Sequence, residues 1–301
     1  MRTFYLFRTA LFLLIATCLY SCDDHRIPTV TPGSNADKLR VKSITQQLAD
    51  ISSRVAAVQK VSVFSYDTQG RLSGITTSPL PADPTAPVEN STYSYDAQNR
   101  LTQLRRVISQ TGANPDPEET YTYTYNHAGQ VSQLDYINNT RDDMNKWQVT
   151  FTYTPGNQLL TSFRSFSWFP VSYSEGIEYT FTGKNVTKAF LTATETRAPA
   201  SSSTGTRTTL YTYDTKKNPF YGVFVIPAPY PPLSNPISGI FHYYTYYGGF
   251  DNLFNLSENN ALSAGSTTYA YTYNVANLPL TRTTTADGKV TETLTYEYES
   301  Y

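Results

Sequence analysis

Aromatic and hydroxyl-bearing side chains alternate along much of the chain. In TYTYTYNHAGQVSQL, residues 120–134, the tyrosines Tyr121, Tyr123 and Tyr125 alternate with threonine before a turn-like segment. A period of two places every second side chain on the same face of a β-strand. The pattern therefore predicts strands with one aromatic face and one hydroxyl-bearing face.

Similar segments recur about every 30 residues. Clear copies are FSYDTQGRL, YSYDAQNRL, YTYNHAGQV and FTYTPGNQL. The aromatic residue before each turn lies at Tyr66, Tyr95, Tyr125, Tyr153, Phe181, Tyr213 and Tyr273. The last interval is 60 residues long. We interpret its middle, FDNLFNLSENNALS, as a degenerate copy that an insertion displaces.

Each copy predicts a β-hairpin with a short turn. Asp, Asn or Thr opens the turn, and a residue type that accepts positive φ follows at Gly70, Asn99, Gly129, Asn157 and Asn185. This is the pattern of a type I turn that a left-handed residue and a bulge close. It pairs Tyr66 with Leu72, Tyr95 with Leu101, Tyr125 with Val131, and Tyr153 with Leu159. The copy at Phe181 is one residue shorter, so a different turn type is expected there.

The predicted fold class is all-β, an antiparallel meander of about eight repeated β-hairpins. The resulting strands are too many for one flat open sheet, so a strongly coiled sheet or a barrel-like structure is expected. Proline-rich or polar pieces, among them residues 76–91 and TRAPASSSTGTR at 196–207, predict long loops at the end opposite the short turns. Residues 45–59 have helical spacing of apolar positions, but the repeat favours strands there.

Composition and charge limit the class of protein. The chain has 301 residues, 39% hydrophobic and 14% aromatic, with 26 tyrosines. Aromatic and β-branched residues favour strands, and the hydrophobic content allows a real core. The net charge is −1 and no basic patch stands out. Nucleic acid is therefore excluded as an expected partner.

The N-terminus has the features of a secretory signal. MRTFYLFRTALFLLIATCLYSC begins with basic residues, continues with an apolar run, and is too short to span a membrane as a helix. Its last residues resemble the lipobox of bacterial lipoproteins, which implies cleavage before Cys22 and a lipid anchor on that thiol. An ordinary signal peptide with incidental cysteines is the alternative. Residues 1–21 are then the signal, 22–37 a flexible tether and 38–301 the hairpin domain.

The repeats themselves resemble a known family. YDTQGRL and YDAQNRL look like the tyrosine-aspartate (YD, or RHS-type) repeat. YDTKKNPF, ENNAL and YTYNVANLP are similar to segments of a bacterial lipoprotein family of unknown function with a porin-like antiparallel β fold. The resemblance covers residues 38–301 and implies an envelope location, as an outer-membrane lipoprotein that is either surface-exposed or turned inward. It implies no catalytic residue and no ligand.

Candidate chemistry is sparse. The three histidines lie far apart in the sequence, and the adjacent acids Glu118–Glu119 and Asp142–Asp143 fall in predicted loops, where solvated carboxylates are common. Asp67, Asp96 and Asp214 are expected to cap turns. We therefore expect no enzyme activity, no cofactor and no bound metal.

Exposed aromatic residues are the remaining candidates for ligand binding. They are Trp168, Phe169, Tyr243, Tyr244, Tyr246 and Tyr247. Burial in a core or an interface competes with this interpretation, because a buried tyrosine removes much apolar area from water. The predicted role is a binding or scaffold module with a glycan or protein partner, sought where the repeat breaks at 219–252. A carrier of an apolar ligand is the alternative. A transmembrane porin is less favoured, because Thr and Ser stand where lipid-facing residues are needed.

Overall fold

The structure, a computed structural model, describes residues 33–34, 38–49, 59–109, 116, 118–138, 146–168, 170–199, 201–222 and 253–301. Its strands are β1 (Gly33–Ser34), β2 (Leu39–Leu48), β3 (Gln59–Tyr66), β4 (Leu72–Leu80), β5 (Val88–Tyr95), β6 (Leu101–Ser109), β7 (Glu118–Tyr125), β8 (Val131–Asn138), β9 (Lys146–Tyr153), β10 (Leu159–Trp168), β11 (Val171–Thr182), β12 (Asn185–Arg197), β13 (Ser201–Lys217), β14 (Asn259–Ala264), β15 (Thr267–Tyr273), β16 (Pro279–Ala286) and β17 (Lys289–Ser300). The short 3₁₀ helix η2 spans Leu253–Leu256. Among the described residues no helix has the length and hydropathy to cross a membrane.

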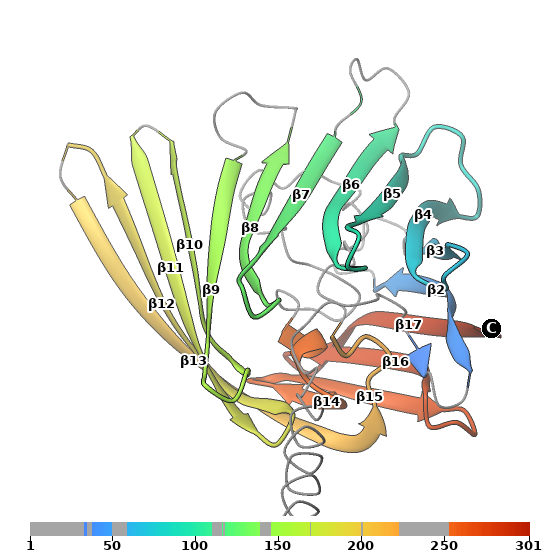
Figure 1. Cartoon of the computed structure of the whole chain (residues 1–301). Coiled ribbons are helices and arrows are strands. Elements are labelled where there is room, and N and C mark those ends of the chain that lie inside the picture. Colours follow the sequence, from blue (N-terminus) through green and yellow to red (C-terminus); the bar gives the residue numbers. More distant parts are fainter. Residues whose placement is uncertain are drawn as a thin grey trace, which may run out of the picture.

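The sheet closes into a barrel. From β2 to β17 each strand pairs antiparallel with the next, and β17 pairs antiparallel with β2. The described sheet has 17 strands. The two-residue strand β1 pairs with the start of β2 and is not part of the ring, so 16 strands form the ring. Figure 1 shows these strands as a strongly coiled, continuous wall. The expected all-β antiparallel meander is confirmed. Of the two expected arrangements, a strongly coiled sheet or a barrel, the sheet forms a closed barrel.

The turns follow the predicted register. Tyr66 pairs with Leu72, and Tyr95, Tyr125 and Tyr153 pair with Leu101, Val131 and Leu159, each next to a bulge. Positive φ angles occur at Gly70 (80°), Asn99 (62°), Gly129 (78°) and Asn157 (65°). In the shorter copy Thr182 pairs with Asn185, so the turn has two residues, and Gly183 (φ 60°) takes the left-handed conformation in place of the predicted Asn185.

Two predictions about strand order need correction. The segment FDNLFNLSENNALS is not a separate copy, because β14 is the second strand of the hairpin that β13 begins. The insertion replaces the short turn of that hairpin. The eighth hairpin instead consists of β17 and β2, from the two ends of the chain, with Tyr298 opposite Val41. Closing the ring across the chain ends leaves no full-length edge between the first and last strands of the repeat.

Two segments expected to be loops are strand in part, and the described residues of 45–59 are mostly strand, as the repeat predicts. Most of TRAPASSSTGTR is strand, because β12 extends to Arg197 and β13 starts at Ser201. Thr194 and Thr204 face each other there, with hydroxyl oxygens 3.0 Å apart. Glu118 and Glu119 lie in β7. Of residues 45–59, the strands β2 and β3 include Thr45–Leu48 and Gln59, and 50–58 lie outside the described residues.

The hydroxyl of the tyrosine before the short turn gives a physical reason why this residue recurs in most copies of the repeat. In six of the eight hairpins this hydroxyl donates a hydrogen bond to a backbone carbonyl of the neighbouring hairpin, and the Tyr273 hydroxyl donates to the Asp214 carboxylate instead. The bonds are Tyr66 to Val41 (2.5 Å), Tyr95 to Leu72 (2.7 Å), Tyr125 to Leu101 (2.6 Å), Tyr153 to Val131 (2.7 Å), Tyr213 to Val186 (2.6 Å) and Tyr298 to Pro279 (2.8 Å). Phenylalanine at 181 lacks this donor. Six of the hairpins are thus fastened to the previous one at the same height.

The YD motif adds a second link between hairpins. The Asp67 carboxylate accepts the backbone N–H groups of Gln69 and Arg71, and its side chain lies 2.7 Å from the Arg71 guanidinium. Burial opposes ionisation, but these donors and the Arg71 charge together hold the pKa of Asp67 below its usual value. The Arg71 guanidinium then stacks over the Tyr95 ring, 4.4 Å from its centroid. Arg100 repeats this over Tyr125 at 4.6 Å.

Side chains fill the barrel in layers that the period of two produces. Two residues before the turn aromatic, every ascending strand places an aromatic ring inside: Phe64, Tyr93, Tyr123, Phe151, Tyr179, Tyr211, Tyr271 and Tyr296. Phe220, from the start of the insertion, contacts Phe64 and Tyr296 with ring centroids 6.4 Å apart. With Leu256 of η2 it belongs to one buried hydrophobic cluster. The short-turn end of the barrel is therefore a packed core.

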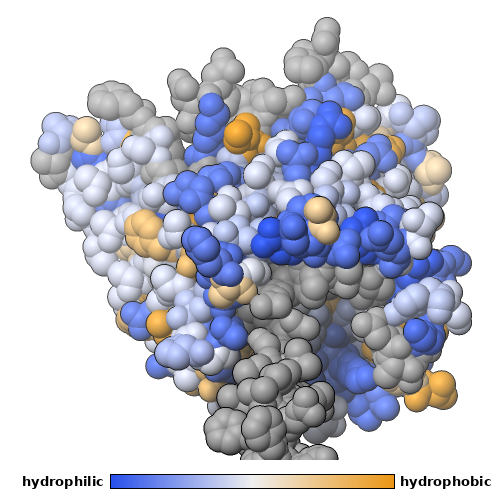
Figure 2. Space-filling model, viewed as in Figure 1, coloured by the Kyte–Doolittle hydropathy of each residue, from blue (hydrophilic) through white to orange (hydrophobic). Residues whose placement is uncertain are grey.

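The outward face carries mostly Thr and Ser. Its exposed apolar side chains stand alone: Ile137 lies between Thr120 and Lys146, and Phe163 between Thr150 and Gly176. Figure 2 shows only scattered hydrophobic residues on the face in view, without a continuous band. A lipid-facing barrel needs an apolar band about 25 Å tall. The described outer positions do not form one.

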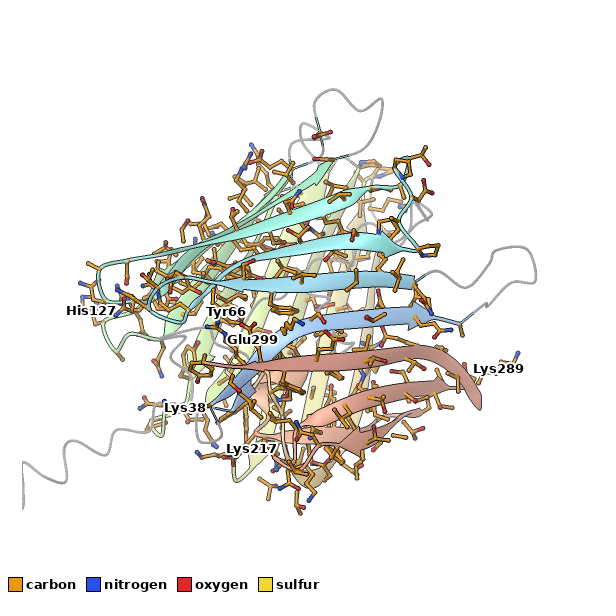
Figure 3. The ribbon with its side chains drawn as sticks, turned by 90° about the vertical axis from the view of Figure 1, so that its right-hand side faces the viewer. Lys38, Tyr66, His127, Lys217, Lys289 and Glu299 are labelled. Carbon is orange, nitrogen blue, oxygen red and sulfur yellow. The ribbon has the colours of Figure 1, made fainter. Side chains whose placement is uncertain are left out.

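The two ends of the barrel differ. Lys38, His127 and Lys217 lie at the short-turn end, and Lys289 lies at the opposite end, here called the distal end (Figure 3). Gly33 and Lys38 precede β2 at the short-turn end, where the Gly33 N–H donates to the Pro219 carbonyl at 2.7 Å. The chain therefore enters the barrel from the short-turn end.

Candidate functional site

Most of the residues predicted to bind a ligand, and the predicted lipidation site, lie outside the part of the chain that the structure describes. Cys22, Phe169, Tyr243, Tyr244, Tyr246 and Tyr247 lie outside the described residues. Trp168 ends β10 at the distal end, paired with Val171, and its side chain is outside the described set. The insertion that contains the tyrosines leaves β13 at the short-turn end. The described residues that flank the insertion therefore lie at the end of the barrel opposite Trp168.

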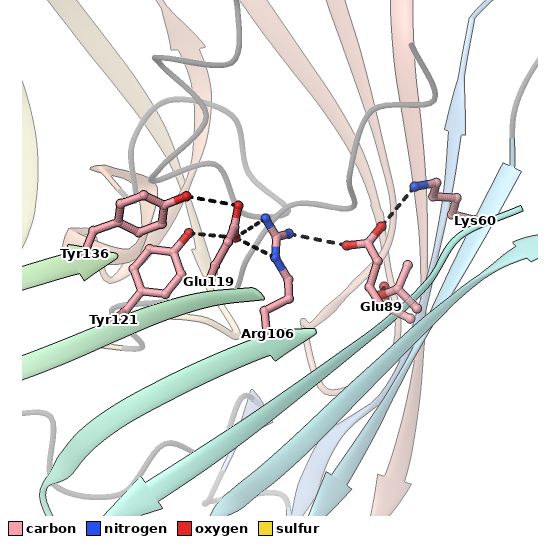
Figure 4. Close-up of polar contacts among 8 residues, drawn as sticks. Lys60, Glu89, Arg106, Glu119, Tyr121 and Tyr136 are labelled. Carbon is pink, nitrogen blue, oxygen red and sulfur yellow. Dashed lines mark hydrogen bonds and ion pairs between the residues drawn. The ribbon is translucent and has the colours of Figure 1, made fainter. Parts of the chain in front are cut away.

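A chain of buried charges crosses the inner wall of β3, β5, β6 and β7 (Figure 4). The Lys60 ammonium lies 2.9 Å from one oxygen of Glu89, and the Arg106 guanidinium lies 3.3 Å from the other. Arg106 also donates to Glu119, with its Nη2 2.5 Å and its Nε 2.8 Å from Oε2. All four residues are buried. Two positive and two negative groups therefore form one continuous, neutral network.

Two tyrosines complete the network. The hydroxyls of Tyr121 and Tyr136 donate to Glu119 over 3.3 and 3.2 Å, and their rings meet edge to face with centroids 5.0 Å apart. Burial raises the pKa of Tyr121 well above its ordinary value, and the negative charge of Glu119 adds to this. Both oxygens of the Glu119 carboxylate are thus satisfied.

The alternation of side chains along a strand decides which charged residues point into the barrel. Arg105 and Arg106 are neighbours on β6, and Glu118 and Glu119 are neighbours on β7. The outer pair Arg105–Glu118 meets at 2.6 Å with side chains 48% and 30% exposed, whereas the inner pair is 5% and 8% exposed. Glu118 and Glu119 therefore lie on opposite faces and cannot act together as a pair of catalytic carboxylates.

Electrostatic pairing keeps the Arg106 guanidinium ionised. Burial alone would lower the pKa of Arg106, but the nearby carboxylates of Glu119 and Glu89 raise it above its ordinary value. An unpaired charge in such a place costs several kcal/mol. The network is thus stable only as a set, and removing one member leaves its partner buried and charged.

Two further ion pairs lie on the inner wall, one buried and one partly buried. Arg164 on β10 lies 2.9 Å from Glu175 on β11, which also accepts the Tyr173 hydroxyl at 3.0 Å. Arg282 on β16 pairs with Glu292 on β17, and Gln46 of β2 donates to Glu292 at 2.6 Å. Each pair is neutral, as the Lys60 network is.

A sequence signal for these charges exists and was missed. Six residues before the turn aromatic stand Lys60, Glu89, Glu119, Trp147, Glu175, Arg207, Thr267 and Glu292. We call this set the charged layer, because five of its eight residues are acids or Lys on the inner face; Arg207 is also charged but lies exposed on β13. An even offset keeps Lys60, Glu89, Glu119, Glu175 and Glu292 on the face of the tyrosines, roughly 20 Å along the strand from the short turns. The layer is the boundary between the aromatic core and the distal end.

The chemistry available at the charged layer is hydrogen bonding. Among the described residues no group of His, Cys, Asp and Glu has the arrangement of a metal site. His127 lies exposed in a turn at the other end. Over the described strands, the guanidinium, carboxylate and phenol groups of these clusters balance in charge, which suits uncharged polar ligands better than ions.

Comparisons with known proteins give a limited result. No protein-family model matches the chain, and no curated protein matches it. A porin-like protein from Bacteroides uniformis has a similar solved structure, with a TM-score of 0.46, 16% sequence identity, and 90% of this chain and 100% of that chain covered. A porin-like protein from Bacteroides vulgatus gives a TM-score of 0.33 at 12% identity, covering 86% and 98%. These values leave the YD-repeat and lipoprotein resemblances as predictions, and the fold rests on the strand pairing itself.

Proposed function

We propose that this protein is a non-enzymatic binding or scaffold module of the bacterial cell envelope, held at the membrane by lipid on Cys22. The observation that carries the proposal is the Ser- and Thr-rich outward face of the barrel. Isolated apolar residues such as Ile137 and Phe163 are surrounded by polar or small neighbours. Such a wall suits water, so the membrane attachment falls to the anchor.

The position of the tether sets the orientation. The chain enters at the short-turn end, and only residues 22–37 separate Cys22 from the hairpin domain. The short-turn end then faces the membrane, and the distal end, with Trp168, faces away from it. Ligand or partner contacts are therefore assigned to the distal end.

The alternatives receive less support. A carrier needs a continuous apolar interior, whereas the described interior contains the buried network from Lys60 to Glu119. A porin needs an apolar outer band, whereas the described outward positions carry mostly Thr and Ser. A glycan or a protein segment, both rich in uncharged polar groups, suits the distal end better.

A glycan array tests the binding role. The lipid-free mature protein is expected to bind a subset of envelope or host glycans, and Trp168→Ala is expected to reduce that binding at least tenfold, because aromatic rings stack on sugar faces. Phe163→Ala is the matched control, since Phe163 is an exposed aromatic on the outer face of the same strand. Absence of glycan binding by the unaltered protein contradicts the glycan form of the proposal. Equal losses in both variants contradict the assignment to Trp168.

A further inference from the structure

The N-terminal half of β13 extends beyond the neighbouring strand β14. It pairs with β12 along Ser201–Leu210, but β14 pairs with it only from Tyr211 onward. The β14–β15 hairpin ends at Gly265, whose N–H donates to the Leu210 carbonyl at 2.9 Å. Within the described part of the chain, no strand lies against the other edge of residues 201–209. In Figure 1 this is the outermost ribbon at the left.

The hydrogen-bonding direction of this edge can be assigned. In an antiparallel strand the N–H and C=O of one residue point to the same side, and the side alternates along the strand. Because Leu210 points its carbonyl toward Gly265, the residues in phase with it turn their backbone groups outward. They are Ser202, Thr204, Thr206 and Thr208.

The edge has none of the usual protection. Residues 201–208 are exposed on both faces of the strand, so this part of the hairpin stands clear of the barrel. It contains no proline, and Arg207 is its only charged residue. A long, flat edge without proline, bulge or covering element is a site for strand pairing between molecules.

We propose that this edge pairs with the same edge of a second copy, antiparallel about a two-fold axis at Gly205. This register uses the whole free stretch and is self-complementary, as a two-fold interface requires. Ser202 then exchanges backbone hydrogen bonds with the partner's Thr208, and Thr204 exchanges them with the partner's Thr206. Arg207 stands opposite a serine and not opposite its own copy. Gly205 at the axis has no side chain to obstruct approach, and a Cβ added there meets nothing within 4 Å.

Gly205→Cys tests this pairing directly. In this register the two Cα atoms at the axis form a non-hydrogen-bonded pair about 4.5 Å apart, within the range for a disulfide. The chain after Cys22 has no other cysteine. Mild oxidation of the lipid-free mature variant is expected to give a disulfide dimer at least tenfold faster than Val275→Cys, a fully exposed control in a short turn. Equal rates for the two variants overturn the proposal.

Thr206→Pro supplies an independent test in the otherwise unaltered chain. Its N–H points away from β12, so proline there removes an intermolecular donor and spares the β12–β13 ladder. Sedimentation is expected to show a concentration-dependent dimer for the unaltered mature protein and a monomer for Thr206→Pro, with unchanged circular dichroism. A monomer for both proteins overturns the proposal. Neither measurement depends on the lipid anchor or on glycan binding.

Discussion

Raising the pH above about 10 is expected to unfold the barrel cooperatively. Burial raises the pKa of Tyr269 and Tyr296 to about 12, and it raises the pKa of Tyr93 and Tyr121 well above the ordinary value. In the unfolded chain the same hydroxyls ionise near pH 10. Below that pH the folded and unfolded states both keep these protons, so stability is unaffected.

Above that pH the unfolded state loses protons that the folded state retains. Each buried tyrosine then lowers the free energy of unfolding by about 1.4 kcal/mol per pH unit. Several such residues together reach the total stability of a domain, about 5–15 kcal/mol, within one to two pH units. Tyrosinate absorbance and circular dichroism are expected to change together in one steep transition. Gradual ionisation near pH 10 with an intact β spectrum contradicts the burial of these rings.

Arg106→Met is expected to destabilise the protein by about 3–5 kcal/mol. Methionine fills a similar volume but leaves the carboxylates of Glu89 and Glu119 buried without the guanidinium that lies between them. The midpoint of urea unfolding measures the loss. Lowering the pH is expected to recover part of it, because a carboxylate without its guanidinium binds a proton more readily.

Arg105→Met is the matched control. It makes the same substitution one residue away, in the outward pair with Glu118, where the side chain is 48% exposed. Water solvates both ions there, so little change in the urea midpoint is expected. Similar losses for both variants contradict the assignment of Arg106 to the interior.

The local parts of the fold could be predicted from the sequence because they depend on neighbouring residues. Turn type, bulge and register follow from the residues between Tyr66 and Leu72, and from the equivalent residues in the next copies. The pairing of β17 with β2 could not be predicted in the same way. It joins residues such as Gln46 and Glu292, which are 246 positions apart. The hydrophobic periodicity of a strand does not indicate which distant strand it pairs with.

The interior charges and the strand at 201–209 were missed for different reasons. Glu119 follows the same alternation as the tyrosines, but a charged residue at a strand end is usually solvated, and only the phase shows that it points inward. The segment SSSTGTR has the composition of a loop. Hydroxyl pairs across the hairpin, such as Thr194 with Thr204, stabilise it as a strand.

The central claim is that a water-facing barrel is attached to the membrane through Cys22 alone. It is tested most directly by exporting the mature chain from Asp23 behind an ordinary cleavable signal peptide, so that no lipid is added. At neutral pH the full-length protein is expected in the detergent phase of a phase partition, and the lipid-free chain in the aqueous phase and the soluble fraction. Retention of the folded lipid-free chain in the membrane fraction after a high-salt wash contradicts the claim.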